Sequence, residues 1–265
     1  MPASPVPAPR FDMTVSRSQL LATLNAELQP ERFRDYGPNG LQVEGRAEIG
    51  TLVSGVTASR ALIDAAIAAG ADAILVHHGL FWRGQDGTVT GWMKQRLQRL
   101  LAHDINLFAY HLPLDAHPTL GNNAQLGARL GLQATGRFGE QELGFIGRPA
   151  DGVPLQDAAA LAHRLESVLN RPVVQVGQAP AAIETIAWCS GGAQGYFEAA
   201  IAAGAQAFIT GEISEPQAHL ARECGVLFYA GGHHATERYG APALGAHVAA
   251  QLGIAHQFID IDNPA

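Results

Sequence analysis

Residues 51–79 read TLVSGVTASRALIDAAIAAGADAILVHHG, a pattern that predicts a strand, a helix and a second strand. Thr57 or Ser59 is placed to cap the helix. Gly70 is placed to end it, because glycine adopts the left-handed conformation at little cost. The run at 74–76 is apolar without alternation, which is typical of a strand in a sheet covered on both faces. The stretch therefore predicts an α/β fold.

A second copy of this pattern follows at an offset of 204 − 70 = 134 residues. Residues 185–210 read TIAWCSGGAQGYFEAAIAAGAQAFIT, and AAIAAGA occurs at both 65–71 and 199–205. Each copy is followed by a predicted helix (92–101 and 216–224) and a further strand (105–110 and 226–229). We expect two similar, duplicated α/β halves with mostly parallel sheets covered by helices. The first half is expected at 15–135. The second, with a connecting segment, is expected at 136–265, and an intertwining of the halves is left open.

Three further segments complete the predicted secondary structure. Residues 17–33 are expected to form a helix with leucines on one face, and 255–261 a final strand with alternating polarity. In the helix at 92–101, we expect an apolar stripe made of Trp92, Met93, Leu97, Leu100 and Leu101.

Composition narrows the classes of function. With 265 residues the chain can form one large or two small domains. A net charge of −7 without Lys/Arg runs argues against nucleic-acid binding, and every long apolar run is broken, which argues against a membrane partner. Cys189 and Cys224 make no disulfide framework and are expected to be buried apolar residues. The proline-rich start at 1–14 is expected to be a disordered tail and not a signal peptide, so we expect a cytoplasmic protein.

The pair His77–His78 ends the second strand of the first copy. Neighbouring strand residues point to opposite faces, so the pair suits two metals, or one metal and another task. A lone buried histidine is more often structural than a ligand. Two histidines at a strand end, followed by Gly79, favour a functional role, because glycine permits close backbone approach.

Two later elements each place a histidine four residues before an acid. These are His111 with Asp115, and His233 with Glu237. For His233 and Glu237, this spacing puts both side chains on one face of a helix. Taken alone, Asp115 is more simply a helix cap or turn residue and Glu237 a solvated one. The recurrence favours ligands, and in α/β sheets ligands bind beyond the carboxyl ends of strands.

Weaker signals lie nearby. The turn SGGAQG at 190–195 offers backbone amides that could cradle an anion, although most such turns are only turns. Phe81, Trp82 and Arg83 could stack a ring and grip a phosphate, or Trp82 could belong to the core. His234 is interpreted as a neighbour of the ligands or an exposed residue.

The motifs VHHG (76–79), YHLPLD (110–115) and GHHATE (232–237) occur in the order that resembles the NGG-interacting-factor-three-like family. Its members are widely named GTP cyclohydrolase I type 2 homologues. The resemblance runs from NGLQV at 39–43 to the last residue. It implies a dinuclear metal centre, placed where the halves meet, and a ring-like homohexamer.

By position, the five ligands of the family fall on His77, His78, Asp115, His233 and Glu237. The resemblance implies that His78 and Asp115 bind one metal, that His77 and His233 bind the other, and that Glu237 bridges them. His111 is then a neighbour that supports Asp115. Mixed imidazole and carboxylate ligands suit Zn, Fe, Mn, Co or Ni.

The expected function is that of a metal-dependent hydrolase of the GTP cyclohydrolase type, in which two divalent metals activate a bridging water. Its substrate is expected to be a small molecule such as a nucleotide, with Glu237 and His111 in catalysis. The alternatives are another metallohydrolase, such as a phosphoesterase, and a non-catalytic, ring-forming, metal-binding adaptor.

Overall fold

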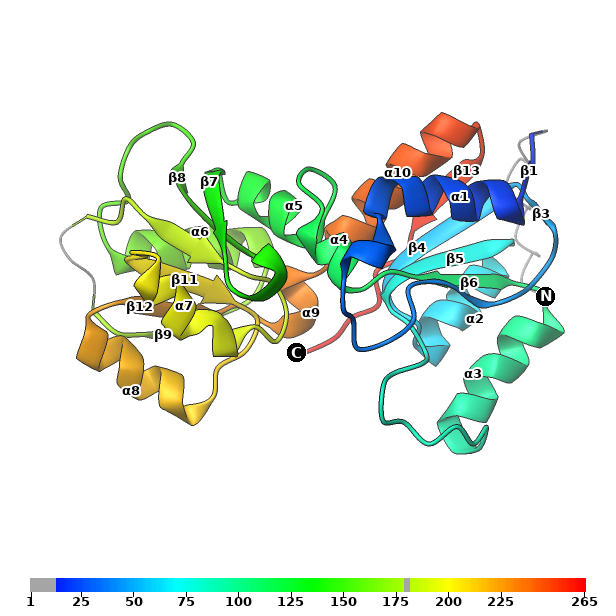
Figure 1. Ribbon diagram of the computed structural model, residues 1–265, viewed down its shortest axis with the longest axis horizontal. Helices are drawn as coiled ribbons and strands as arrows, with labels where there is room; N and C mark the ends of the chain where they lie inside the picture. Colours follow the sequence, from blue (N-terminus) through cyan, green and yellow to red (C-terminus); the bar gives the residue numbers. More distant parts are fainter. Residues whose placement is uncertain (1–12, 179–181) are drawn as a thin grey trace, which may run out of the picture. The chain divides into compact units, whose positions relative to one another are not determined.

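The structure is a computed structural model that describes residues 13–178 and 182–265. Most of the tail expected at 1–14 therefore lies outside the described residues. The chain forms two compact units (Figure 1). The first comprises the described residues up to His111 together with 244–261, and the second comprises 112–243 with 262–265.

These bounds differ from the expected boundary at 135/136. Residues 112–135 belong to the second unit because Leu126, Leu130 and Leu132 are part of its hydrophobic core. The C-terminal segment returns to the first unit because its last strand pairs there with residues 51–54. The chain thus passes between the units three times, at 111/112, 243/244 and 261/262, and not once.

The first unit is built on a five-stranded sheet of order β13-β4-β5-β6-β2. All neighbours in it are parallel except β2, which runs antiparallel to β6. This sheet fits the parallel arrangement expected for the first copy. Its strands are β2 (Gly40–Val43), β4 (Thr51–Thr57), β5 (Ala73–His78), β6 (Asn106–Ala109) and β13 (Ala255–Phe258). A separate two-stranded ladder joins β1 (Val15–Ser16) to β3 (Glu48–Ile49).

Helices cover both faces of this sheet. Figure 1 shows α2 (Arg60–Ala68) and α3 (Gly91–Ala102) on one side and α1 (Arg17–Leu28) and α10 (Gly240–Leu252) on the other. The side chain of Ser59 caps α2 at its start, and Gly70 follows its end with φ +71°, as predicted. In the described part of the chain, no helix has the length and apolar character that crossing a bilayer requires.

Two expectations about these helices and one about the last strand need correction. The helix expected at 17–33 ends at Leu28, because Gln29 is left-handed and Pro30 starts a short 3₁₀ turn. In α3, Trp92 and Leu101 are exposed although they were assigned to the apolar stripe. The buried Met93, Leu97 and Leu100 define the inner face, and at about 100° per residue the other two fall on either side of it. The last strand, β13, stops at 258 and not at 261.

The second unit is built on a six-stranded sheet of order β7-β8-β10-β11-β12-β9. Only β10, β11 and β12 are parallel to one another. The expectation of a mostly parallel sheet is therefore wrong for this unit. The connecting segment adds antiparallel strands, because a hairpin and strand additions at an edge need no helical crossover. Its strands are β7 (Leu132–Phe138), β8 (Gly144–Pro149), β9 (Val174–Val176), β10 (Ile186–Trp188), β11 (Ala207–Thr210) and β12 (Leu227–Ala230).

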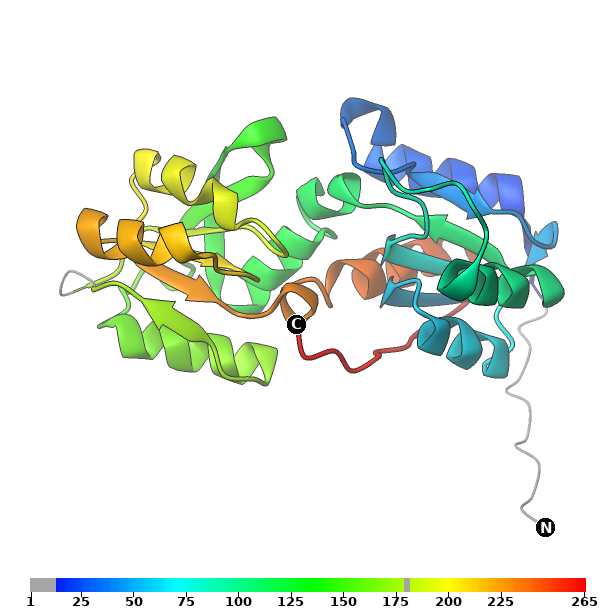
Figure 2. The same ribbon diagram turned by 90° about the horizontal axis from the view of Figure 1, so that it is seen from below.

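Helices also cover this second sheet. Figure 2 shows α6 (Ala158–Leu169) on one side of β11 and β12, and α7 (Phe197–Ala202) and α8 (Glu215–Cys224) on the other. Leu161 and Leu165 of α6 share a core with Trp188, whereas Phe197 of α7 packs edge-on against Phe228 with ring centroids 4.9 Å apart. The remaining helices are α4 (Leu112–Ala116), α5 (Asn122–Arg129) and α9 (His233–Thr236).

The two copies of the repeat also share a hydrogen-bonding device. Oδ2 of Asp72 accepts from the backbone N–H groups of residues 50 and 51, at 2.8 and 2.9 Å. At the same offset of 134, Oε1 of Gln206 accepts from the N–H groups of residues 184 and 185, at 2.7 and 2.9 Å. This match in position and partner is consistent with a duplicated unit.

Candidate functional site

The histidine pair lies at the carboxyl end of β5 in the first unit. His77 is fully buried and His78 partly so. Their rings lie with centroids 4.5 Å apart, although neighbouring strand residues start on opposite faces. The rings can converge because β5 ends at His78, whose Nδ1 lies 3.1 Å from Oγ1 of Thr57 at the end of β4.

The tautomer of His77 follows from its hydrogen bond. Its Nδ1 lies 3.1 Å from the carbonyl oxygen of Tyr110. A carbonyl oxygen only accepts, so Nδ1 carries the proton, and in the neutral ring Nε2 carries the lone pair. This is the arrangement that protein metal sites use to hold a ligating imidazole in orientation.

His111 joins the pair through a buried polar network. Its Nδ1 lies 2.7 Å from Oδ1 of Asp35, whose side chain is only 3% exposed. Asn39 donates to the other oxygen of Asp35 at 2.9 Å and accepts from the backbone N–H of His111 at 2.8 Å. The network fixes both the ring and the backbone of His111, which follows β6.

The three imidazoles of the first unit form a cluster suited to a metal ion. One ring nitrogen from each of His77, His78 and His111 lies within 4.8 Å of the other two. Imidazole nitrogen suits Zn, Cu, Fe and Ni, so the donor chemistry fits a transition metal.

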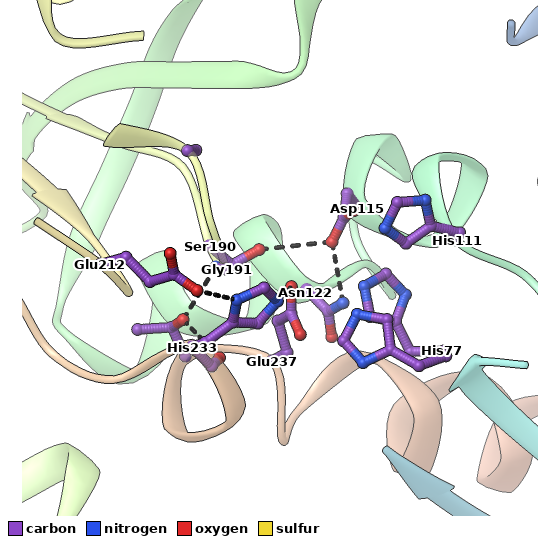
Figure 3. Close-up of polar contacts among 12 residues, drawn as sticks. His77, His111, Asp115, Asn122, Ser190, Gly191, Glu212, His233 and Glu237 are labelled. Atoms are coloured by element: carbon purple, nitrogen blue, oxygen red, sulfur yellow. Dashed lines mark hydrogen bonds and ion pairs between the residues drawn. The ribbon is translucent and has the colours of Figure 1, made fainter. Parts of the chain in front are cut away.

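Asp115 is held rigidly in the second unit. It lies on α4 and is 8% exposed. Its Oδ1 accepts from Nδ2 of Asn122 at 2.9 Å and from Oγ of Ser190 at 3.3 Å (Figure 3). Asn122, fully buried, also accepts from the backbone N–H of Gly240 at 2.9 Å. Two donors on one oxygen fix the orientation of the Asp115 carboxylate.

His233 and Glu237 face each other across the single turn of α9. Nε2 of His233 lies 3.3 Å from Oε1 of Glu237, as the four-residue spacing predicted. Nδ1 of His233 lies 2.6 Å from Oε1 of Glu212. The Glu237 carboxylate raises the pKa of His233 to about 9, Glu212 adds to the effect, and burial opposes it. Oxygens of Glu237 and Asp115 also approach within 4.8 Å of each other, so the second unit gathers two carboxylates and one imidazole.

In the turn at 190–195, which was more simply expected to be an ordinary turn than an anion cradle, three backbone amides are bonded within the protein. The backbone N–H of Ser190 donates to Oδ1 of Asn123 at 2.7 Å, that of Gly191 to Oγ1 of Thr236 at 2.9 Å, and that of Ala193 to Thr210 at 3.3 Å. These amides are occupied by the protein itself. The turn serves instead to bring the backbone of Gly191 against the carboxylate of Glu237.

The structure also locates the aromatic and basic residues, the histidine and the cysteines that the sequence analysis discussed as weaker candidates or as core residues. Trp82 lies beside the imidazoles, with its ring 5.1 Å from that of His111 and nearly perpendicular to it. Arg83 donates to the backbone oxygen of Asp35 at 2.7 Å. His234 is buried. Burial raises the pKa of the Cys189 thiol, and nearby Asp115 adds to this. Cys224 is exposed, so its predicted burial is wrong.

Sequence reasoning missed the residues that hold the candidate ligands. Asp35 lies 76 residues from His111 in the chain, and no local pattern connects them. Asn122 and Asn123 stand at the start of α5 after Gly121, where polar side chains would pass for helix caps. Glu212 could have been found from the sequence, since the offset of 134 residues makes it the counterpart of His78 in the second copy.

Comparisons with known proteins agree on one family. The sequence profile described as Duf34/NIF3 (NGG1p interacting factor 3) matches residues 15–264. A protein of Neisseria meningitidis serogroup A named "GTP cyclohydrolase 1 type 2 homolog" is 53% identical over 251 residues, 95% of this chain and 100% of its own length. A protein of Yersinia pestis with the same name is 54% identical, over 93% of this chain and 98% of its own.

Solved structures show the same fold. A structure described as "protein ybgI, unknown function" has a TM-score of 0.91 and 45% identity, over 95% of this chain and all of its own. The protein TTHA1606 from Thermus thermophilus has a TM-score of 0.82 and 32% identity, with the same coverage.

Proposed function

We propose, because the chain belongs to the Duf34/NIF3 family, that it is a metal-dependent hydrolase of the kind named in its relatives as GTP cyclohydrolase 1 type 2 homologues. The observation that carries the proposal is the state of the donor atoms within each unit. His77 is held with Nδ1 protonated, and Oδ1 of Asp115 accepts hydrogen bonds from Asn122 and Ser190. These are the states in which imidazole and carboxylate bind metal.

The proposed ligands of two divalent metal ions are His77, His78, Asp115, His233 and Glu237. Bound there, such ions would lower the pKa of a coordinated water toward about 7 and polarise the substrate. Zn, Fe, Mn, Co and Ni all accept this mixture of nitrogen and oxygen ligands. Glu237, only 3% exposed, is the proposed bridging carboxylate.

His111 is the proposed general acid–base residue. With Nδ1 donating to Asp35, its Nε2 can accept a proton from an attacking water and return it to the leaving group. For a guanine nucleotide, one water would add to the imidazole carbon and open the ring to a formamide. A second water would then release formate. Trp82, next to His111, is placed to pack against a flat substrate.

The test is formate release from GTP by protein loaded in turn with each candidate metal. His77→Ala is the matched variant, expected to lose at least half of the bound metal by elemental analysis and to release no formate. His103→Ala, an exposed histidine of the same unit, should match the wild type. Absence of formate with every metal would refute the GTP reaction. Unchanged metal content in His77→Ala would refute the ligand assignment. A phosphoester offered to the same preparations tests the phosphoesterase alternative.

A non-catalytic adaptor is the second candidate, favoured by the description of the family as an interacting factor. The proposed homohexamer suits either function, and light scattering after size exclusion measures it. Glu237→Gln separates the two candidates. If a hexamer with this change still restores a deletion phenotype, the adaptor is supported; if it fails while assembly is intact, the hydrolase is supported.

A further inference from the structure

Glu212 occupies an unusual position for an acid at the end of a strand. It follows β11 by two residues and is 46% exposed. Its Oε1 lies 2.6 Å from Nδ1 of His233, a shorter contact than the 3.3 Å between Nε2 of His233 and Oε1 of Glu237. Its other oxygen accepts from Nε2 of Gln194 at 3.3 Å. The Glu212 carboxylate is therefore held from two sides.

The contact determines which nitrogen of His233 faces the candidate site. A carboxylate accepts hydrogen bonds, so Nδ1 of His233 holds its proton toward Glu212, and Nε2 is the nitrogen that a metal would take. Nε2 points the other way, toward Oε1 of Glu237. An imidazole held by a carboxylate on one nitrogen presents the other as a more basic metal ligand. A plain surface ion pair would contribute little to stability and would leave metal binding unchanged.

The repeat gives this position a counterpart. At the offset of 134, Glu212 corresponds to His78, and the preceding Gly211 corresponds to His77. A side chain at Gly211 would collide with the backbone of His233, 2.6 Å from its Cα. The second copy thus has a glycine at 211, which leaves room for the backbone of His233. The acid that follows this glycine contacts the ring of His233.

The first unit also contains a histidine whose Nδ1 contacts a carboxylate, although the acid does not occupy the position equivalent to Glu212. Nδ1 of His111 contacts Asp35 at 2.7 Å, in the same sense as the contact of His233 with Glu212. In both units, therefore, the histidine of the His-x-x-x-acid element has a carboxylate from elsewhere in the chain on Nδ1. An incidental ion pair at the surface of one unit does not account for this recurrence.

We propose that Glu212 is a positioning residue that fixes the tautomer and orientation of His233, so that its Nε2 binds metal. The inference rests on the proposed metal centre. Glu212 itself is not proposed to touch metal or substrate.

The experiment measures zinc affinity of the full chain by competition with a chelating dye. The variants are Glu212→Ala, Glu212→Gln and the control Glu223→Ala, an exposed acid of α8. Glu212→Ala should weaken zinc binding at the affected site by about 10- to 100-fold, the usual effect of removing a residue that orients a ligand. Glu212→Gln keeps an acceptor oxygen and should lose less. Glu223→Ala should bind as the wild type does.

A spectroscopic readout separates positioning from a general structural effect. In zinc-loaded protein labelled with ¹⁵N-histidine, His233 should carry zinc on Nε2 and a slowly exchanging proton on Nδ1. Glu212→Ala should lose that proton signal while the other histidines keep theirs. If Glu212→Ala fails to fold, the near-isosteric Glu212→Gln decides by the same two measurements.

The outcomes separate this inference from the proposed function. If the wild type binds zinc and both Glu212 variants bind it within about twofold, the positioning role is overturned and the metal centre stands. If the wild type binds none of the candidate metals, the metal centre falls and the role of Glu212 falls with it.

Discussion

Replacing Gly191 with alanine is expected to displace Glu237 from its position. Gly191 has φ +69°, and a Cβ there would overlap Oε1 of Glu237 and lie 3.2 Å from Nε2 of His233. Glu237 is only 3% exposed, so its carboxylate has little room to withdraw. The substitution therefore acts on two proposed ligands without changing either of them.

The expected effect of Gly191→Ala has two parts, a loss of stability and a loss of zinc affinity. A left-handed conformation costs a residue with a Cβ about 1–2 kcal/mol, which for a chain of this size lowers the melting temperature of metal-free protein by about 2–8 °C. A charged hydrogen-bonding contact contributes about 1.5–3 kcal/mol. A displaced Glu237 carboxylate should therefore weaken zinc binding by about 10- to 150-fold.

The assay compares Gly191→Ala with Gly195→Ala in the same turn. A Cβ at Gly195 would meet nothing within 4 Å. Thermal unfolding of the metal-free protein measures the loss of stability, and competition for zinc with a chelating dye measures the loss of zinc affinity. Wild-type zinc affinity in Gly191→Ala would refute the reasoning, and so would an equal loss in Gly195→Ala, because either result would show that Glu237 does not depend on the backbone at 191.

Two further changes test other contacts. Asn122→Leu removes the hydrogen bonds to Asp115 and to the N–H of Gly240, and should lower the free energy of unfolding in urea by about 2–4 kcal/mol; a loss below about 0.5 kcal/mol would show that neither bond matters. A thiol reagent should react quickly with the exposed Cys224 alone, because Cys189 is buried and its thiol pKa is raised. Cys224→Ser should then abolish the fast phase, and a persistent fast phase would contradict the burial of Cys189.

The α/β units were predictable because their signals are local. In each copy, the signals for the helix and for the apolar strand lie within about thirty residues of one another. The predicted strand–helix–strand order is found in both copies. The edge of the second sheet was not predictable in this way. Strand β9 pairs with β12, about fifty residues away, and only the folded chain reveals that partner.

Some contacts of the candidate site were predictable from local sequence, and others were not. The spacing of His233 and Glu237 within one helical turn predicted the contact that is found. The acids that hold the imidazoles were not predictable locally, because Asp35 and His111 meet only through tertiary structure. At 190–195 the glycine-rich pattern gave only a weak indication of an anion site, and the backbone amides of Ser190 and Gly191 are bonded to Asn123 and Thr236.

The offset of 134 residues relates the two copies position by position. Positions 72 and 206 perform the same structural task in both copies, although one is Asp and the other Gln. Positions 78 and 212 stand at equivalent strand ends, yet one is a proposed ligand and the other contacts a proposed ligand. The scaffold thus repeats its backbone hydrogen bonds, whereas the side chains beyond its strands differ. The positions where the copies differ are therefore where function should be sought.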